Sequence, residues 1–491
     1  MARPLPVITS IESAFDQARL ATRALYEFGQ SIVNPTIRLG VTGLSRAGKT
    51  VFITALVHGL VRGGRFPIFE AYADGRIAGA RLAPQPDDAI PRFDYEEHVR
   101  ALVEERRWPE STRRISELRV VIDYQSRNGA ERSLTLDIVD YPGEWLLDLP
   151  LLNLIYGQWS ADSVARSRAG LRAGAGAAWQ RALAAADPSS PADENTAIEL
   201  AREFTSYLRL CRDDRYAMST LAPGRFLMPG DLENSPALTF APLDVPRDGE
   251  PPQGSLWAMM QRRYEAYKAV VVRPFYNEHF LRLDRQIVLM DALAAFNAGD
   301  DAIRDLQSAL GGILDCFRVG RRTLVSALLR PRADRILFAA TKADHLHRSD
   351  HDRLEAILKR MTERTGNRAM ALGAEIDIVA LAAVRATREA QVSRGGETLP
   401  SILGVVAAGE ASGTRVFDGE TEVAVFPGDL PADPDALLRA GNEKRATAQS
   451  DKMRFLRFRP PGLELNDDGV PVLPHIRLDR AMQFLFGDRL Q

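Results

Sequence analysis

The loop between the first apolar strand and the first helix of this sequence constrains its fold more than any other feature. Residues 37–43, IRLGVTG, are apolar and partly β-branched, as a buried strand of a parallel sheet should be. From Thr50 the sequence TVFITALVHGLV has the apolar spacing of a helix. A GxxxxGK[ST] loop at a strand-to-helix turn is typical of phosphate binding, so the sequence predicts a nucleotide-binding α/β domain.

The residues of this loop suit a nucleoside triphosphate. Gly43 and Gly48 permit backbone angles that turn successive N–H groups toward phosphate oxygens, and the helix N-terminus adds positive potential. We expect Lys49 to reach the β- and γ-phosphates and Thr50 to offer its hydroxyl to Mg²⁺. The predicted phosphate-binding residues are Gly43, Ser45, Arg46, Ala47, Gly48, Lys49, Thr50 and Val51.

A second motif ends a predicted hairpin. The apolar runs 116–125 and 133–140 are separated by the turn residues RNG, and the second run ends in Asp140-Tyr141-Pro142-Gly143. In phosphate-driven switches such an Asp holds Mg²⁺ through water, and the Gly N–H contacts the γ-phosphate. DxxG alone is a common turn, but its position after a phosphate-binding strand and a hairpin favours the functional interpretation.

The residue after this motif is the candidate for orienting the attacking water. Many hydrolytic relatives of such folds use Gln there, whereas this chain has Glu144. A carboxylate can accept a hydrogen bond from water but repels the γ-phosphate, so we expect slow turnover. The predicted catalytic residues are Glu144, Lys49 and Gly143.

A third motif bears on the base. The predicted strand 335–341 is followed by Lys342-Ala343-Asp344. The carboxylate of Asp344 can accept from both the ring N–H and the exocyclic amine of guanine, whereas adenine offers no such pair of donors. We expect Thr341, Lys342 and Asp344 to bind the base, and the end of a predicted strand over 376–387, at Ala383 and Val384, to place an N–H on the guanine oxygen. The alternative is that Asp344 only caps a helix. The motif would then not select guanine, and the protein could be an ATPase.

Other polar residues are weaker candidates. The predicted Mg²⁺ ligands are Thr50, Thr112 and Asp140, with Ser111 as the substitute for Thr112. The candidates for an arginine that stabilises the transition-state charge from within the same chain are Arg106, Arg107, Arg113 and Arg114. We expect most of them to be surface charges. His345, His347, Asp350 and His351 lack a metal-ligand spacing, and we expect them to form a solvated helix start.

Composition excludes several classes. The 491 residues carry 63 Lys and Arg against 65 Asp and Glu, a net charge of −2, which gives no reason to expect nucleic acid as a partner. Two cysteines, the absence of a signal-peptide pattern and the absence of an 18-residue apolar run predict a cytoplasmic protein that does not cross the bilayer. Peripheral association with the inner membrane remains open.

Together these motifs resemble the YcjX-like P-loop family of bacterial GTPases over essentially the whole chain. The segments GLSRAGKT, RRWPEST, DIVDYPGEWLLDLP, FAATKADH and HIRLDRAMQFLFGDRL stand as that family has them. The resemblance implies a Ras-like nucleotide domain with an additional helical domain, and an association with bacterial envelope or phage-shock stress. It implies no known effector.

The expected fold is a doubly wound α/β Ras-like P-loop domain with a large, mainly helical insertion. Residues 37–145 and 284–491 form its two parts, the second with a small β excursion at about 396–430 and a C-terminal helix. Residues 146–283 are the insertion, with helices predicted over 160–187, 195–214 and 256–271. Residues 1–36 are expected to form a helix docked on the core.

The expected function is a GTP-hydrolysing switch with GTP or GDP and Mg²⁺ as ligands and an unidentified protein as effector or regulator. The insertion begins just after Gly143. Movement of Gly143 on loss of the γ-phosphate would therefore shift the insertion. Two alternatives stay open: a nucleotide-binding scaffold with negligible turnover, and the ATPase.

Overall fold

The computed structural model describes residues 35–44, 46–111, 114–233, 235–316, 333–370, 374–394, 396–412, 414–438, 455–466 and 469–491. Residues 1–34 of the predicted N-terminal helix lie outside these ranges. Three residues of the predicted site, Ser45, Thr112 and Arg113, lie outside them too.

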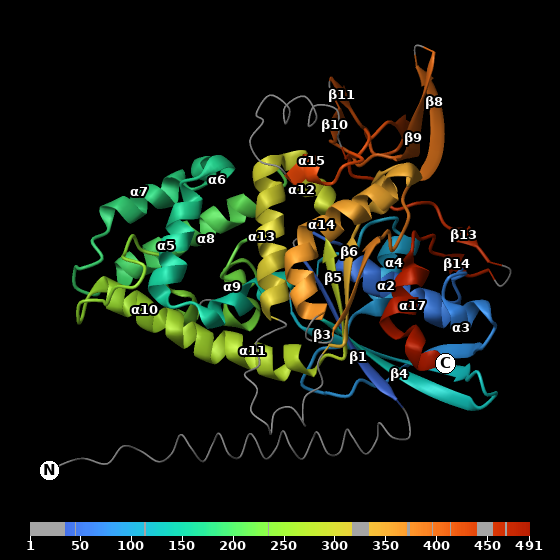
Figure 1. Ribbon diagram of the computed structural model, residues 1–491, viewed down its shortest axis with the longest axis horizontal. Helices are drawn as coiled ribbons and strands as arrows, with labels where there is room; N and C mark the ends of the chain where they lie inside the picture. Colours follow the sequence, from blue (N-terminus) through green and yellow to red (C-terminus); the bar gives the residue numbers. More distant parts are fainter. Residues whose placement is uncertain are drawn as a thin grey trace.

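A seven-stranded mixed sheet forms the centre of the nucleotide domain (Figure 1). Its strand order is β2-β3-β4-β1-β5-β6-β7. Strands β2, β3 and β4 pair antiparallel, and β4, β1, β5, β6 and β7 pair parallel in that order. The strands are β1 (Thr36–Gly43), β2 (Ile77–Ala83), β3 (Ser116–Gln125), β4 (Glu131–Asp140), β5 (Arg285–Met290), β6 (Arg335–Ala340) and β7 (Glu375–Ala380).

The sheet register brings the sequence motifs to one edge. Val41, near the end of β1, lies opposite both Asp140 at the end of β4 and Ile287 in β5. The ends of β6 and β7 follow in the same order, since Ala340 lies opposite Ala380. Ligands of open α/β sheets bind outside the carboxyl ends of the parallel strands, so this edge is where a site is expected.

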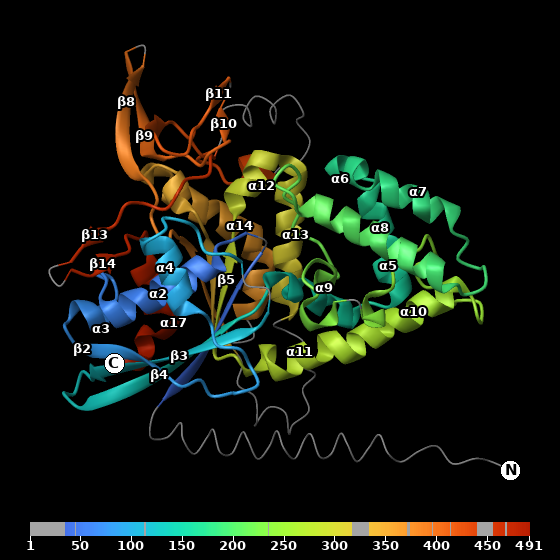
Figure 2. The ribbon, with the colours of Figure 1, turned by 180° about the vertical axis from the view of Figure 1, so that it is seen from behind.

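Both faces of the sheet are covered by helices, which explains why the parallel strands are apolar throughout (Figures 1 and 2). Alternate residues such as Leu39 and Leu136 pack with α2, α4 and α17. Val139 and Val288 point to the other face, which is covered by α13 and α14. The helices are α2 (Lys49–Arg62), α4 (Tyr95–Val103), α12 (Ala292–Ala298), α13 (Asp300–Cys316), α14 (His351–Met370) and α17 (Leu478–Phe486).

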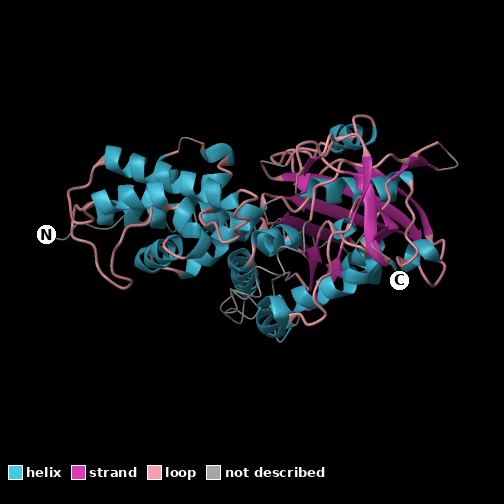
Figure 3. Cartoon of the chain, turned by 90° about the horizontal axis from the view of Figure 1, so that it is seen from above, coloured by secondary structure: helices cyan, strands magenta, loops and turns pink. Residues whose placement is uncertain are grey.

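A helical lobe stands beside the sheet, between β4 and β5 in the chain (Figure 3). Its core is aromatic: Trp159 stacks on Tyr264 with ring centroids 5.0 Å apart, and Trp179 stacks on Tyr207 at 5.2 Å. The same apolar cluster continues into α13 and α14. The helices are α5 (Tyr156–Ser167), α6 (Gly170–Ala175), α7 (Ala177–Ala185), α8 (Glu194–Arg212), α9 (Gly224–Leu227), α10 (Leu256–Tyr267) and α11 (Arg273–Glu278).

A small β unit follows β7. Strands β12, β9 and β8 form an antiparallel sheet, with a core that includes Ile402, Phe417 and Phe458. The unit begins at Arg388 rather than at about residue 396. Its strands and the remaining short elements are β8 (Arg388–Arg394), β9 (Glu397–Val405), β10 (Ala411–Ser412), β11 (Arg415–Val416), β12 (Glu422–Val425), β13 (Glu464–Leu465), β14 (Pro471–Val472), α3 (Glu70–Ala73) and α15 (Asp435–Leu438).

Three details differ from the sequence prediction. The predicted helix over 160–187 is three helices, because the chain turns at Gly170, with φ +49°, and again at Gly176. The predicted strand over 376–387 ends at Ala380. Edge strand β2 was missed, since IAGARLA is short and only half-buried. In the part of the chain that the structure describes, no helix is long and apolar enough to cross a membrane.

Candidate functional site

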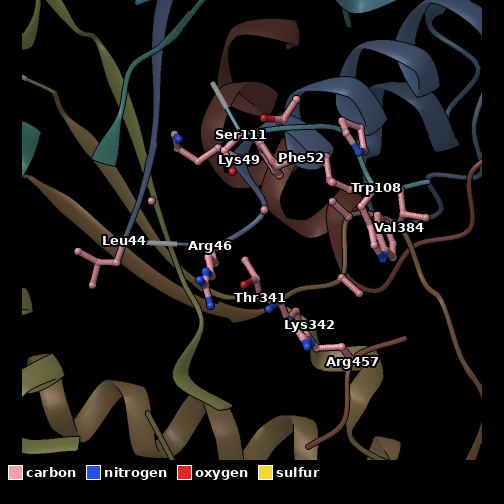
Figure 4. Close-up of a pocket in the computed structure, with 18 of the residues that line it drawn as sticks. Leu44, Arg46, Lys49, Phe52, Trp108, Ser111, Thr341, Lys342, Val384 and Arg457 are labelled. Atoms are coloured by element: carbon pink, nitrogen blue, oxygen red, sulfur yellow. The ribbon is translucent and has the colours of Figure 1, made fainter. Parts of the chain in front are cut away.

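A cavity of about 750 Å³ opens at the carboxyl edge of the sheet (Figure 4). Three parts of the chain surround it: the nucleotide domain, the helical lobe and the small β unit. Its lining residues are Gly43, Leu44, Arg46 to Phe52, Trp108 to Ser111, Glu144, Arg212, Met228, Thr341, Lys342, Asp344, His345, Leu381 to Val384, Ala407, Arg457 and Phe458.

The glycine-framed loop joins β1 to α2 as predicted. Gly48 has φ +77°, a conformation that an L side chain rarely adopts, and it is the residue before the first turn of α2. The N–H of Leu44 donates to the carbonyl of Leu289 at 3.0 Å, which fixes the start of the loop to β5. The loop therefore presents its backbone and the N-terminus of α2 to the cavity, the arrangement that favours an anion.

Three predicted phosphate and metal residues come together at this end. Lys49 Nζ lies 4.0 Å from Asp140 Oδ1; the Asp140 side chain is buried and that of Lys49 is nearly so. Thr50 Oγ1 donates to the carbonyl of Glu110 at 3.2 Å, so the segment before β3 closes over the start of α2. The parallel register of β1 and β4 produces this meeting, since both motifs end neighbouring strands.

Thr50 and Asp140 fit a magnesium ion by their chemistry. Hydroxyl and carboxylate oxygens are the ligands that Mg²⁺ prefers, and it commonly takes one or two of them together with phosphate oxygens and waters. Within the described ranges, no group of three or more His, Cys, Asp and Glu side chains could hold a metal ion on its own. A cation at this site would therefore need the phosphates as partners.

Gly143 lies against the loop itself. A Cβ at this position would be 1.6 Å from the carbonyl oxygen of Gly43, so only glycine allows the two backbones to approach so closely. The next residue, Glu144, is buried, and its Oε1 lies 3.8 Å from Nη1 of Arg212 at the end of α8. The predicted water-orienting side chain thus faces a cation from the helical lobe.

The segment that begins at Gly143 is bound tightly by the helical lobe. This segment, η1 (Gly143–Asn153), contains Asp148, which accepts from the N–H of Gly224 at 2.7 Å and from the hydroxyl of Tyr267 at 2.6 Å. Trp145 Nε1 donates to the carbonyl of Met228 at 3.1 Å. Burial raises the pKa of Asp148 to about 6, and the bonds from Tyr267 and Gly224 offset that effect only in part.

The base-binding candidates line the other end of the cavity. Lys342 is in the left-handed conformation, with φ 61°, and its ammonium pairs with Asp291. Asp344 is buried and its Oδ2 accepts from the N–H of Ala386 at 2.8 Å. Thr341 Oγ1 donates to the carbonyl of Met290 at 3.1 Å. Ala383 and Val384 line the cavity from the loop after β7.

The residues after Asp344 are not the solvated helix start that was expected. His345, Asp350 and His351 are all buried, while His347 is half-buried. His345 packs edge-on against Phe458 with ring centroids 5.1 Å apart, and His351 Nε2 lies 2.9 Å from the carbonyl of Ala343. Burial lowers the pKa of both of these histidines. These two histidines hold the loop after β6 in place, a role that the sequence spacing did not reveal.

Three of the four arginine candidates are surface charges, as was expected for most of them. Arg106, Arg107 and Arg114 are exposed, and none of them lines the cavity. The arginines that do line it are Arg46, Arg212 and Arg457. Arg212 and Arg457 were missed because they are far from every motif in the sequence and reach the cavity only through the fold.

These features define the class of protein: a Ras-like P-loop nucleotide-binding domain that carries a large helical insertion. The chain belongs to the YcjX-like family, DUF463, whose family model matches residues 37–490. The protein named Ras-like GTPase YcjX from Escherichia coli (strain K12) is 37% identical over 475 residues, which cover 94% of this chain and 97% of that protein. The protein of the same name from Shewanella oneidensis is 34% identical over 495 residues, with the same shares covered.

Proposed function

We propose that this protein binds GTP and hydrolyses it to GDP and phosphate with Mg²⁺. The observation that carries the proposal is one cavity lined both by Lys49, whose Nζ lies 4.0 Å from Asp140 Oδ1, and by Asp344. The names of its relatives support the same activity, since both are called Ras-like GTPases.

At the base end, Asp344 is the proposed guanine-reading residue. Its Oδ2 already accepts from Ala386 N–H, which orients the carboxylate. Two carboxylate oxygens offer about four acceptor sites, so the side chain can still accept from the ring N–H and the amine of guanine. We assign base binding to Thr341, Lys342, Asp344, Ala383 and Val384.

At the phosphate end, the loop residues hold the anion. We assign Gly43, Ser45, Arg46, Ala47, Gly48, Lys49, Thr50 and Val51 to phosphate binding. Thr50, Asp140 and, in the segment before β3, Thr112 would hold Mg²⁺, which when bound neutralises charge on the β- and γ-phosphates. Lys49 adds its ammonium, and the N–H of Gly143 contacts the γ-phosphate.

The reaction is an in-line displacement at the γ-phosphorus. A water oxygen forms a bond to phosphorus while the bond to the β–γ bridging oxygen breaks, and the bridging oxygen leaves with the electron pair on GDP. The proton of the water ends on the released phosphate. Glu144 orients the water by accepting a hydrogen bond from it. Its carboxylate also repels the γ-phosphate, so the rate is slow.

The nucleotide state is proposed to move the insertion, residues 146–283. Gly143 touches the P-loop, and η1 continues from it directly into the contacts of Asp148 with Gly224 and Tyr267. A shift of Gly143 on loss of the γ-phosphate is therefore transmitted to the helices. The family resemblance suggests bacterial envelope or phage-shock stress as the setting, with an unidentified protein as effector and peripheral association with the membrane.

One observation favours a second candidate, a scaffold in which GTP is structural. Glu144 stands where other GTP hydrolases have Gln, and in the structure it faces Arg212. If that pair holds Glu144 away from water, turnover would be negligible.

Hydrolysis by purified protein tests the two candidates. We expect bound guanine nucleotide after purification, and phosphate release from added GTP that stops when EDTA removes Mg²⁺. Lys49→Ala is the inactive control. Retention of GTP without release of phosphate would support the scaffold, and retention of adenine nucleotide would support the ATPase.

Hydrogen exchange tests the switch. Amide exchange in residues 146–282 is expected to differ between the GDP complex and the complex with a non-hydrolysable GTP analogue. Identical exchange would refute the movement without affecting hydrolysis.

A further inference from the structure

We propose that Arg212, from the helical insertion, is a catalytic residue that stabilises the charge on the γ-phosphoryl group during hydrolysis. This inference rests on the proposed GTPase function. It assigns to a distant part of the chain the cis-acting arginine that sequence reasoning sought between residues 106 and 114.

A rigid element positions Arg212. It is the last residue of α8 (Glu194–Arg212), a helix of 19 residues. The buried side chains of Phe204 and Tyr207 anchor this helix in the aromatic core of the insertion, where both contact Trp179. The backbone of Arg212 is therefore held, while its side chain, 28% exposed, reaches the cavity.

The neighbours of Arg212 place it at the γ-phosphate end. Its Nη1 lies 3.8 Å from Oε1 of Glu144. Glu144 directly follows Gly143, whose Cα is in contact with the carbonyl of Gly43 in the P-loop. A guanidinium beside Glu144 is thus on the side of the cavity where the water and the γ-phosphate meet.

The other two arginines of the cavity are held by carboxylates. Arg46 and Arg457 both pair with Asp214, and Arg457 Nε also donates to Glu410 at 2.6 Å. Arg212 makes a looser pair, since 3.8 Å is too long for a hydrogen bond to Glu144. Its Nη1 also donates to Sδ of Met228 at 3.8 Å, so its donors can turn to a phosphate without breaking a short bond.

A guanidinium is suited to this task. Its planar fork of N–H groups matches phosphate oxygens and stays charged at every relevant pH. The transition state of phosphoryl transfer spreads negative charge over the equatorial oxygens, and an arginine supplied in cis or in trans stabilises it. Arg212 would also offset part of the charge of Glu144, which weakens the repulsion between that carboxylate and the γ-phosphate. Hydrolysis then requires the insertion to be docked.

Single-turnover kinetics test the proposal, with Arg209→Ala as the matched control. Arg209 lies one turn earlier on α8, is exposed and does not line the cavity. We expect Arg212→Ala to slow GTP hydrolysis about 100-fold or more, as loss of one preorganised charge stabiliser does. Arg212→Lys should not restore the rate, because an ammonium lacks the fork. Added guanidinium ion should restore part of it.

A second readout separates a catalytic role from a structural one. GDP with aluminium fluoride mimics the transferring phosphoryl group, and its affinity should fall in Arg212→Ala while that of GDP alone is unchanged. Equal losses of affinity for both ligands, or hydrolysis as fast as in Arg209→Ala, would overturn the proposal and leave the GTPase function standing. A parent protein that hydrolyses no GTP would overturn both.

Discussion

The cavity has two walls that are built in different ways. The sheet wall consists of loops at the carboxyl ends of β1, β4, β6 and β7, and each of its functional groups belongs to a short motif. The insertion wall consists of Arg212, Met228 and the contacts of η1, which come from helices far apart in the sequence. We propose that the sheet wall binds the nucleotide and that the insertion wall senses and acts on its last phosphate.

The two walls also differ in how they treat charge. On the sheet wall, Lys49 Nζ lies 4.0 Å from Asp140 Oδ1, which is too long for a hydrogen bond between them. Behind the insertion wall, Asp148 is fully enclosed and accepts two short hydrogen bonds from the helical lobe. The charged groups of the sheet wall can therefore still bind a ligand, whereas the hydrogen bonds of Asp148 hold η1 to the helical lobe. Four substitutions test this division, beginning with the largest effect.

Lys49→Ala should abolish detectable GTP binding while the fold is retained. Removing one partner of a nearly buried charge interaction costs about 3–5 kcal/mol, because the phosphate charge loses its compensation. Calorimetric titration with GTP and a thermal unfolding curve check both parts. Lys359→Ala, an exposed lysine on α14, is the control. GTP binding by Lys49→Ala at parental affinity would show that the sheet wall is not the phosphate site.

Asp344→Asn should lower GTP affinity by several kcal/mol and create affinity for xanthosine triphosphate. The amide oxygen can still accept from Ala386 N–H, but the amide nitrogen then meets a guanine donor instead of accepting from it. Xanthine has a carbonyl where guanine has its amine, so the same nitrogen can donate to it. Titrations with GTP, ATP and xanthosine triphosphate measure this. Unaltered GTP affinity, or ATP bound by the parent as tightly as GTP, would contradict a guanine site at Asp344.

The sheet wall could be predicted from sequence because its chemistry is local. Gly43 to Thr50 and Thr341 to Asp344 are continuous segments, and apolar strands before them fixed their place in the fold. The hairpin of β3 and β4 was predicted for the same reason, since its two apolar runs are joined by a short turn. A local signal is enough when backbone geometry and a few adjacent side chains form the site.

The insertion wall could not be predicted in this way. Arg212 stands 68 positions after Glu144, at the end of an amphipathic helix whose sequence indicates only a buried face. Asp148 is the one charged residue in the apolar run of residues 145–152, and its hydrogen bonds come from Gly224 and Tyr267. His345 was misjudged for a similar reason, because Phe458 covers it from the far end of the chain. Such contacts exist only after the lobes pack.

Asp148→Asn tests whether ionisation of Asp148 makes the stability of the folded protein depend on pH. The pKa of Asp148 is about 6 in the folded protein against 3.8 ordinarily, so the folded state binds the proton more tightly. Stability from this group is therefore full below pH 4 and falls as the pH rises to 6, by about 3 kcal/mol at most. Asn keeps an acceptor for Gly224 and does not ionise.

Thermal unfolding of parent and variant between pH 4 and 7 measures that difference. The stability of Asp148→Asn relative to the parent should increase from pH 4 to 6 and then level off. Asp248→Asn, an exposed position in the same lobe, should show no such trend. A relative stability that is constant with pH would mean that burial does not raise the pKa of Asp148.

Glu144→Ala should have the smallest effect, because this residue belongs to both walls. It follows Gly143 on the sheet side and faces Arg212 on the insertion side. Loss of its acceptor should slow single-turnover GTP hydrolysis roughly tenfold or more with little change in affinity, since general-base positioning is removed while phosphate contacts remain.

Two effects of Glu144→Ala oppose the loss of hydrolysis rate. Removing the carboxylate also removes its repulsion of the γ-phosphate and releases Arg212 from its pair, and both changes favour the reaction. Glu144→Gln separates them, because the amide still accepts from water but carries no charge. A rate above the parent in Glu144→Gln and below it in Glu144→Ala would show that the water contact accelerates the reaction and the charge slows it. Equal rates in all three proteins would assign the water to another residue and leave Glu144 only as the link between η1 and α8.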